Sequence, residues 1–286
     1  MADMSGSDPS DVEAPGHREA VPTQSAPETA GKRNAFTELM SPKNKQLKQA
    51  ETKNIKAPSK HTHTSHFKPR DALGAYIEKP ESYPPSTVVY YNDDFVAIND
   101  LYPKSSLHLL LLPRDPEKSL MHPFDAFEDT EFLDKVRAEV KKLRALAAGE
   151  LRRRYGKESA QERARQEAMD KDPPVDELPP GRDWEREIMS GIHAHPSMNH
   201  LHIHVLSVDR HSDRLKHRKH YNSFTTPFFI DLDDFPLAKD DVRRHPGREG
   251  YLKRDFICWR CGRNFGNKFQ ELKNHLEEEF QEWKRL

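Results

Sequence analysis

The pattern of apolar and polar positions separates a long polar beginning from a region with regular elements. Residues 1–62 are rich in Pro, Ser, Lys and acidic residues and have no apolar periodicity, which predicts a disordered tail. Further along, apolar residues recur at helical spacing within 71–78, and Pro80 ends this predicted helix. A longer helical pattern covers 125–169, where apolar residues line one face of the first part.

Short runs of β-branched, aromatic and aliphatic residues predict the strands of an antiparallel sheet. Five such runs lie at 87–91, 95–98, 107–112, 187–193 and 228–230. The first two are joined by an Asn-Asp-Asp turn and predict a β-hairpin, and the last predicts an edge strand. Strands of this kind with one or two helices predict an α+β domain.

A further run, at 199–206, differs from the others because histidine alternates three times with an aliphatic residue. Successive side chains of a strand point to opposite faces, so the histidines share one face and the aliphatic side chains share the other, toward a core. The two sets are His200, His202 and His204, and Leu201, Ile203 and Val205. Neutral imidazoles offer nucleophilic nitrogens, proton donors and metal ligands. A nucleophile site is favoured over a structural metal clip, because the preceding turn at 196–199 has no carboxylate or cysteine to complete a ligand shell; a histidine-rich strand without a chemical role is the third interpretation.

Composition restricts the class of protein. Hydrophobic residues make up 34% and charged residues 33% of the 286 residues, so much of the chain lies outside any core. A net charge of -1 excludes a uniformly basic nucleic-acid binder, and any such contact must come from local patches. No apolar run approaches the roughly 20 residues of a membrane span, and residues 1–4 lack the features of a signal peptide, so we expect no membrane association. Both cysteines lie in one C-x-x-C, which indicates a reducing compartment rather than a disulfide framework.

Three polar segments require separate interpretation. Residues 149–183 form an almost wholly charged insert with interleaved acidic residues, which predicts a solvated helix or linker rather than a basic nucleic-acid surface. Residues 215–224 place basic side chains beside aromatic ones, which suits contacts with phosphates and bases. In the tail, an island with Phe36, Leu39 and Met40 either docks as a short helix in a partner's groove or is a chance apolar cluster.

The C-terminal region contains the ligands for a metal. Cys258 and Cys261 form the C-x-x-C, and His275 follows fourteen residues later on a predicted helix. Glu279 shares a helix face with His275, because the two stand at i and i+4. Two thiolates, one imidazole and one carboxylate satisfy a zinc ion, with Glu278 as the reserve for the fourth position. A redox C-x-x-C is the alternative, but no thioredoxin-like βαβ pattern surrounds the motif.

These two constellations together carry a resemblance to known proteins. The His-x-His-x-His run with two following apolar residues resembles the histidine-triad signature. The C-terminal set of two cysteines, a histidine and a glutamate resembles a zinc finger. A histidine triad followed by such a finger resembles the aprataxins, which are DNA-end deadenylases. The resemblance is strongest to their fungal members, which similarly replace the last zinc histidine by glutamate. The resemblance covers roughly 67–279 and departs from the family at the insert, 149–183. The chain also lacks the forkhead-associated domain of animal forms.

The resemblance implies an α+β histidine-triad antiparallel sheet with helices, followed by a small zinc-finger module. We therefore predict a disordered tail at 1–62, a catalytic domain at 63–235 that contains the insert, and a DNA-binding finger at 236–286. It also implies a single structural zinc ion and no catalytic metal. We further expect a monomer in the nucleus, with the tail island as a docking segment for a repair protein.

The implied activity is the removal of AMP from 5′-adenylated DNA ends left by abortive ligation, which restores a 5′-phosphate. His202 would be the nucleophile that becomes adenylylated, His200 and His204 would orient it, and His108 and His193 would support the phosphates. The implied nucleotide-binding set is Asn99, Asp100, Leu101, Tyr102, Pro103, Lys104, Ser197 and Met198. The implied DNA-contacting set is Phe67, which resembles a wedge on the terminal base pair, with Lys216, Lys219 and Tyr221. The implied zinc ligands are Cys258, Cys261, His275 and Glu279.

Two other functions stay open at this point. The first is a small-nucleotide phosphoramidase or dinucleoside polyphosphate hydrolase with the same triad, although a small ligand requires neither a finger nor a basic patch. The second is a non-catalytic zinc-finger DNA-binding adaptor, although the intact set of three histidines argues against it.

Overall fold

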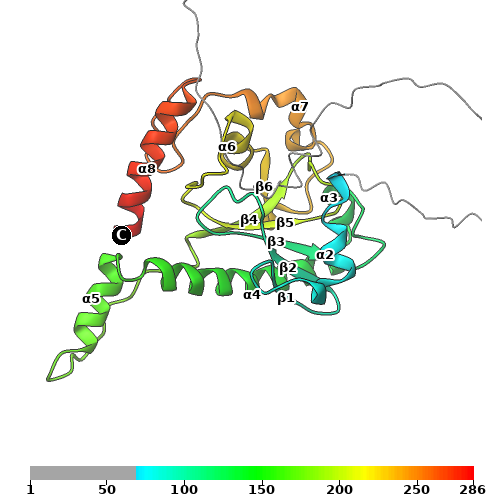
Figure 1. Ribbon diagram of the computed structural model, residues 1–286. Helices are drawn as coiled ribbons and strands as arrows, with labels where there is room; N and C mark the ends of the chain where they lie inside the picture. The colour runs from blue at the N-terminus through cyan, green and yellow to red at the C-terminus, as the bar shows by residue number, and fades with distance from the viewer. Residues whose placement is uncertain (1–68) are drawn as a thin grey trace, which may run out of the picture. The chain divides into compact units, whose positions relative to one another are not determined.

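Six strands form an antiparallel sheet in the order β1-β2-β3-β5-β4-β6 (Figure 1). The strands are β1 Val88–Tyr91, β2 Phe95–Asn99, β3 His108–Pro113, β4 Ile188–His193, β5 Ile203–Ser207 and β6 Phe229–Asp231. Each neighbouring pair is antiparallel, and β6 lies at an edge beside β4, as predicted. The helices pack on this sheet, so the predicted α+β fold is confirmed.

The structure is a computed structural model that describes residues 69–286. The predicted tail, its island of Phe36, Leu39 and Met40, and the predicted wedge Phe67 lie outside the described residues. Among residues 69–286, no helix is both long and apolar enough to span a membrane.

The histidine-rich strand is shorter than predicted. It begins at Ile203, and residues before it form hydrogen bonds outside the sheet. The Leu201 amide donates to the carbonyl of Ser119 at 2.8 Å, and the Asn199 amide donates to the carbonyl of Arg70 at 2.9 Å. The alternation nevertheless persists, because the three aliphatic side chains between the histidines are buried in the main core.

Helices cover both faces of the sheet. On one face, η1 Pro69–Asp71, α2 Gly74–Glu78 and η2 Pro80–Ser82 replace the single helix predicted at 71–78. Leu73 packs there against apolar side chains of β1, β2 and β3. On the other face lies the main core, to which α4 Thr130–Tyr155 contributes a buried apolar stripe. The predicted 125–169 helix is divided into α3 Pro123–Ala126, α4 and α5 Ala160–Met169, because Gly156 follows α4 and Ser159 caps α5.

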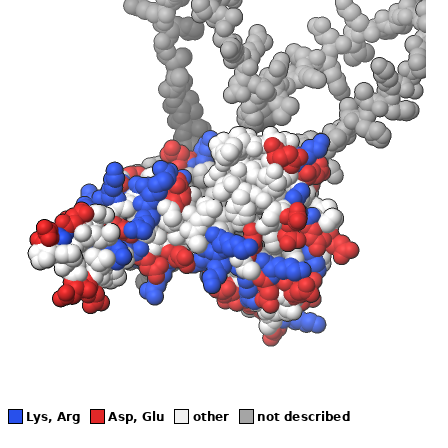
Figure 2. Space-filling model, turned by 90° about the horizontal axis from the view of Figure 1, so that it is seen from below, with Lys and Arg blue, Asp and Glu red and all other residues white. Residues whose placement is uncertain are grey.

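The charged insert is folded in the structure. Its arginines pair with nearby carboxylates: Arg152 contacts Glu162 at 3.0 Å, and Arg153 and Arg154 both contact Glu150 at 2.7 Å. On the face shown in Figure 2, Lys and Arg side chains lie among Asp and Glu side chains rather than forming a continuous basic surface. The prediction of a solvated helix therefore fits α5 better than the alternative of a linker.

The insert ends in a cluster that we call the tryptophan clamp, formed by Arg182, Trp184, Glu187 and Trp283. The Arg182 guanidinium lies 4.4 Å from the Trp184 ring centroid and 4.7 Å from that of Trp283. Arg182 also pairs with Glu187 at 3.0 Å, and the Trp283 indole N–H donates to Glu187 at 2.6 Å. A desolvated cation–π contact contributes about 2 kcal/mol. The clamp therefore fixes the C-terminal helix to the start of β4.

The C-terminal region is built around one helix. Its elements are α6 Arg218–Thr225, η3 Leu232–Asp234, η4 Val242–Arg244, α7 Pro246–Glu249, η5 Tyr251–Lys253 and α8 Phe269–Arg285. The first half of α8 places Leu272 and Leu276 in a small core of the finger. Its second half places Phe280 and Trp283 in the main core. The finger and the sheet are therefore joined through a shared helix.

Candidate active site and metal centre

Four of the five predicted catalytic histidines meet on one face of the sheet. His108 begins β3, His193 ends β4, and His202 and His204 lie just before and within β5. The ring centroid of His204 is 5.1 Å from that of His108, 4.5 Å from His193 and 4.9 Å from His202. Because β3, β5 and β4 are neighbours in the sheet, residues distant in sequence form this cluster, which we call the histidine cluster.

Hydrogen bonds assign a proton to each of three rings. The Lys104 backbone N–H donates to His108 Nδ1 at 3.1 Å, so the His108 proton is on Nε2, which lies 2.9 Å from His204 Nδ1. His204 then carries its proton on Nε2. His202 Nδ1 lies 2.8 Å from the carbonyl oxygen of His200, which can only accept, so the lone pair of His202 is on Nε2. The cluster thus holds a nucleophilic nitrogen beside an N–H donor.

Desolvation keeps these rings neutral. Burial lowers the pKa of His108 to about 4, and it lowers the pKa of His202 below its ordinary value. The pKa values of His193 and His204 lie well below the ordinary range, first through desolvation and then through repulsion from the other rings and Lys104. A neutral nucleophile is therefore available at pH 7.

The histidine cluster makes the stability of the fold depend on pH. A group whose folded pKa is depressed binds fewer protons in the folded state than in the unfolded chain, so stability falls as pH decreases between the two pKa values. For His108 this window runs from its ordinary 6.5 down to about 4. The change amounts to about 3 kcal/mol at 1.36 kcal/mol per pKa unit.

We expect the free energy of unfolding, measured with urea, to fall between about pH 6.5 and pH 5. The variant His108→Gln, which cannot titrate, should show a shallower decline than the wild type. An equal slope for the two proteins would contradict the assignment of a depressed pKa to His108.

The loop before β3 brings a carboxylate and an amine to the cluster. One oxygen of Asp100 accepts from the Tyr102 amide at 2.7 Å, and the other lies 3.4 Å from His108 Nδ1. The Lys104 ammonium donates to the Tyr102 carbonyl, and burial lowers its pKa although Asp100 acts in the opposite direction. Leu101 and Tyr102 are 60% and 62% exposed, so they form an apolar rim beside these charged groups.

Two other members of the predicted nucleotide-binding set make structural bonds. The side-chain amide of Asn99 donates to the carbonyl of Ser86 at 3.1 Å. The carbonyl of Pro103 accepts from the Ser212 hydroxyl at 2.6 Å. These bonds hold the loop at its two ends.

His200 is not among the histidines of residues 69–286 whose rings contact one another. Its ring lies against Gly74 of α2, where an added Cβ would stand 2.8 Å from Nε2. The prediction that His200 acts together with His202 and His204 therefore stays a prediction. What His200 supplies to His202 is its backbone carbonyl.

The segment before His200 is bonded to the start of the described chain. Arg70 Nε donates to the carbonyl of Ser197 at 3.0 Å, and the Asn199 side chain donates to Asp71 at 2.5 Å. Met198 packs on the small core under α2. Ser197 and Met198 therefore lie beside the residues that follow the predicted wedge.

The predicted DNA-contacting residues separate into exposed and buried side chains. Lys216 and Lys219 are exposed at the start of α6. Tyr221 is 0% exposed, and its hydroxyl donates to the carbonyl of Ile257 at 2.8 Å and accepts from the Trp259 amide at 3.0 Å. We remove Tyr221 from the DNA-contacting set, because its ring is enclosed between α6 and the finger.

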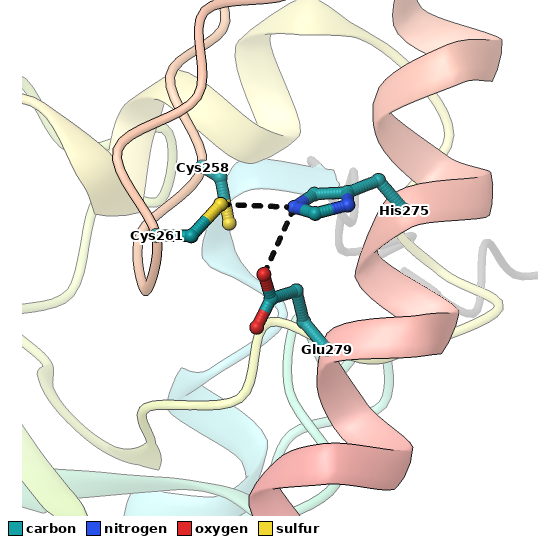
Figure 3. Close-up of side chains that lie close together, drawn as sticks. All are labelled: Cys258, Cys261, His275 and Glu279. Atoms are coloured by element: carbon teal, nitrogen blue, oxygen red, sulfur yellow. Dashed lines mark hydrogen bonds and ion pairs between the residues drawn. The ribbon is translucent and has the colours of Figure 1, made fainter.

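The four predicted zinc ligands converge between the C-x-x-C turn and α8 (Figure 3). Their ligand atoms all lie within 4.8 Å of one another. His275 Nε2 is 3.1 Å from Cys261 Sγ and 3.0 Å from Glu279 Oε1. Two thiols, an imidazole and a carboxylate form a donor set that fits zinc, whose ligands lie about 2.0–2.3 Å from the ion.

Two neighbours organise this zinc site. Arg260, between the cysteines, pairs with the other oxygen of Glu279 at 2.5 Å. Glu278 lies 3.7 Å from His275 Nδ1, on the side of the ring that faces away from Cys261, and its side chain is 79% exposed. Such contacts orient metal ligands without coordinating the ion.

Three other residues, Asp100, His108 and His204, also place ligand atoms within 4.8 Å of one another. Here the Lys104 amide bonds to one nitrogen of His108, and His204 bonds to the other. Hydrogen bonding accounts for the proximity, so we assign no metal to this group.

Comparison with known proteins agrees with both sites. Residues 81–211 match the HIT domain family, and residues 225–282 match the C2HE / C2H2 / C2HC zinc-binding finger family. An aprataxin-like protein of Schizosaccharomyces pombe is 37% identical over 217 residues, which cover 75% of this chain and 82% of the relative. This chain belongs to the aprataxin-like family. The aprataxin-like protein of Saccharomyces cerevisiae is 40% identical over 215 residues, or 74% of this chain and 95% of the relative.

Solved structures of aprataxin-like proteins are also similar. The crystal structure of the aprataxin ortholog Hnt3 from Schizosaccharomyces pombe has a TM-score of 0.59 at 35% identity and covers 74% of this chain and 92% of its own. The crystal structure of the aprataxin ortholog Hnt3 in complex with DNA has a TM-score of 0.58 at 34% identity and covers 75% and 96%. This aprataxin-like chain is accordingly a hydrolase of the histidine-triad superfamily.

Sequence reasoning did not assign to the histidine cluster three residues that the structure places at the site. Gly74 gives the His200 ring room, Phe224 packs on the histidine cluster, and Arg210 bonds to the backbone of Phe224. A glycine within a helical pattern carries no chemical signal, and Phe224 belongs to the 215–224 segment, which was predicted to contact phosphates and bases. Arg210 stands in a charged run, where an arginine is ordinarily solvated.

Proposed function

We propose that this protein removes AMP from 5′-adenylated DNA ends through a covalent adenylyl-histidine on His202. One observation carries the proposal. The bond from His202 Nδ1 to the His200 carbonyl directs the lone pair of Nε2 outward, next to the N–H of His204. Membership of the aprataxin-like family supplies the substrate class.

The reaction proceeds in two displacements. His202 Nε2 attacks the α-phosphorus of the 5′-5′ pyrophosphate, an N–P bond forms, and the P–O bond to the DNA phosphate breaks. The DNA leaves with a 5′-phosphate. Water then attacks the adenylyl-histidine, the N–P bond breaks, and AMP and a proton are released. Dividing one difficult displacement into two is the advantage of covalent catalysis.

The surrounding groups stabilise charge on the phosphoryl oxygens. The His204 Nε2–H donates to a non-bridging oxygen, and His108 fixes the tautomer that makes this possible. The Lys104 ammonium, desolvated beside Asp100, supplies the positive charge. The His193 ring packs against the His204 ring at the edge of the cluster. Preorganised donors in a desolvated site need little reorganisation during the reaction.

The loop before β3 forms the nucleotide subsite. We assign Asp100 to the ribose hydroxyls and the exposed side chains of Leu101 and Tyr102 to the base, since they form the apolar rim. Asn99 and Pro103 hold the loop, and we assign Ser197 and Met198 to contacts with the DNA strand.

The DNA contacts come from exposed cations and the finger. Lys216 and Lys219 neutralise backbone phosphates, so binding weakens as salt rises. We assign Phe67, outside the described residues, to stack on the terminal base pair, a contact worth about 1–3 kcal/mol. A family member solved in complex with DNA supports DNA as the binding partner.

We further propose a single structural zinc ion per chain, held by Cys258, Cys261, His275 and Glu279. These ligands belong to the finger, and none of them lies in the histidine cluster, so we assign no catalytic metal. Zinc supplies folding free energy to so small a module. We also propose that the protein acts in the nucleus as a monomer, where the Phe36, Leu39 and Met40 island would dock to a repair protein.

Turnover of two substrates tests the proposal. The protein is incubated with 5′-adenylated nicked DNA and, separately, with a dinucleoside polyphosphate, and AMP release is followed by mass. We expect faster turnover of the DNA substrate and a trapped adenylyl adduct on the protein. Faster turnover of the free dinucleotide would favour a small-nucleotide hydrolase. DNA binding without turnover or adduct would favour an adaptor.

A further inference from the structure

A single aromatic ring packs against three members of the histidine cluster. Phe224, in the last turn of α6, is 5% exposed. Its ring centroid lies 5.4 Å from that of His108, 4.6 Å from His193 and 5.1 Å from His204. The three interplanar angles are 90°, 61° and 84°, so each imidazole meets this ring at a steep angle.

Two of these imidazoles have one nitrogen without a hydrogen-bond partner. The Nε2 atoms of His193 and His204 are buried and have no hydrogen-bond partner among the described residues. A terminal sp³–sp² torsion is broad, so packing must help to restrict a ring that is hydrogen-bonded through one nitrogen at most. Phe224 packs on both rings more closely than Phe229, whose ring centroid lies 6.2 Å from that of His193 and 6.3 Å from that of His204.

A buried arginine holds Phe224 in place. Arg210 is 5% exposed and has a backbone φ of 51°, a left-handed conformation that is uncommon for residues other than glycine. Its guanidinium donates to the carbonyl of Ser207 at 3.0 Å and to the carbonyl of Phe224 at 3.1 Å. It thereby links the end of β5, which carries the histidines, to the end of α6.

The conformation and burial of Arg210 are costly for a merely structural bond. Burying a guanidinium is unfavourable unless hydrogen bonds compensate, and a left-handed non-glycine residue adds about 1–3 kcal/mol. The adjacent carboxylate of Asp209 is engaged elsewhere, because it accepts hydrogen bonds from the Ser106 amide at 2.9 Å and from the Ser106 hydroxyl at 2.6 Å. Strain of this kind concentrates at functional sites, where surrounding contacts sustain it.

We propose that Phe224 is a positioning residue for the reaction, which fixes the ring planes of His193 and His204, and that Arg210 anchors it. The inference rests on the proposed function of the histidine cluster. Phe224 touches neither nucleotide nor DNA. It holds the His204 N–H in line with the phosphoryl oxygen and thereby keeps the donor preorganised.

The variant Phe224→Leu keeps an apolar side chain but removes the flat ring. We expect kcat on adenylated nicked DNA to fall about 10-fold, with KM changed less than about twofold, because a small misplacement of a catalytic group acts on the chemical step. Phe124→Leu is the matched control, since Phe124 is also buried but packs on Phe235 and His122, outside the cluster.

Both variants should have a lower melting temperature, and only Phe224→Leu should lose kcat. Equal kcat values for the two variants, at a temperature where both are folded, would overturn the proposal. Arg210→Lys keeps the charge but removes the two-carbonyl fork, so it should lose kcat in the same way as Phe224→Leu. A wild-type kcat in Arg210→Lys would contradict the proposed role of Arg210 in holding Phe224.

Imidazole ¹⁵N spectra provide a readout that does not depend on activity. In Phe224→Leu we expect the ring signals of His193 and His204 to shift or broaden, while those of Phe124→Leu stay at their wild-type positions. Unchanged cluster signals in Phe224→Leu would overturn the positioning role even if kcat fell. Turnover by a His202→Ala variant would instead refute the covalent mechanism and leave this spectroscopic result standing.

Discussion

Replacing His202 with alanine is expected to lower turnover of adenylated DNA on the order of 10³-fold or more, because the covalent route loses its nucleophile. DNA affinity should stay close to wild type, since Lys216 lies just before α6, Lys219 lies on α6, and the other proposed DNA contacts lie in the finger. The measurement is single-turnover AMP release with saturating protein, together with the dissociation constant for an unadenylated nick. The adenylyl adduct should also disappear from the mass spectrum.

His195→Ala is the matched control for this change. His195 is an exposed histidine in the same segment and lies outside the histidine cluster. The structure also predicts how the loss of turnover should differ between variants of the neighbouring histidines. His204→Ala should have a large but incomplete effect because it removes a donor, whereas His200→Ala should have a smaller effect because the carbonyl that bonds to His202 remains. Near-wild-type turnover in His202→Ala would refute the covalent mechanism.

Removal of a zinc ligand should have the second-largest effect. Structural zinc contributes about 10–16 kcal/mol of binding free energy in zinc-finger peptides, and this free energy stabilises the fold. Cys258→Ser or Cys261→Ser should therefore lose the bound metal, lower the melting temperature and weaken DNA binding. Metal content by elemental analysis should fall from one zinc per chain to none.

Two glutamates test the identity of the fourth ligand. Glu279→Gln should weaken zinc binding more than Glu278→Gln, because Glu279 faces the thiols while Glu278 lies on the far side of the His275 ring. Competition with a chromogenic chelator measures the difference on folded protein. Equal zinc affinities for the two variants would contradict the proposed ligand set.

Local patterns were sufficient to predict those features that depend on neighbours in sequence. The alternation around His202 predicted correctly that Leu201, Ile203 and Val205 face a core, because a strand has a period of two. The spacing of Cys258, Cys261, His275 and Glu279 predicted a cluster, because a turn and one helix face place the ligands in fixed relation.

Features that depend on distant contacts were not accessible from the pattern. The strand at His202 is shorter than predicted because Asn199 bonds to Arg70, which is 129 positions earlier (199 − 70). Tyr221 is buried because the finger folds over α6, an arrangement that nothing in residues 215–224 encodes. The same reason applies to Arg210, whose burial is set by the end of α6.

The shared helix α8 limits how the protein can be divided. A cut between the predicted domains, near residue 236, would separate Phe280 and Trp283 from the main core, in which both are buried. The catalytic part would then expose the apolar surface that Phe280 and Trp283 cover. The finger would keep α8, but the second half of this helix would lose its contacts with the main core. Gene fusions, truncations or exchanges between relatives would therefore need to keep α8 and the insert from the same protein.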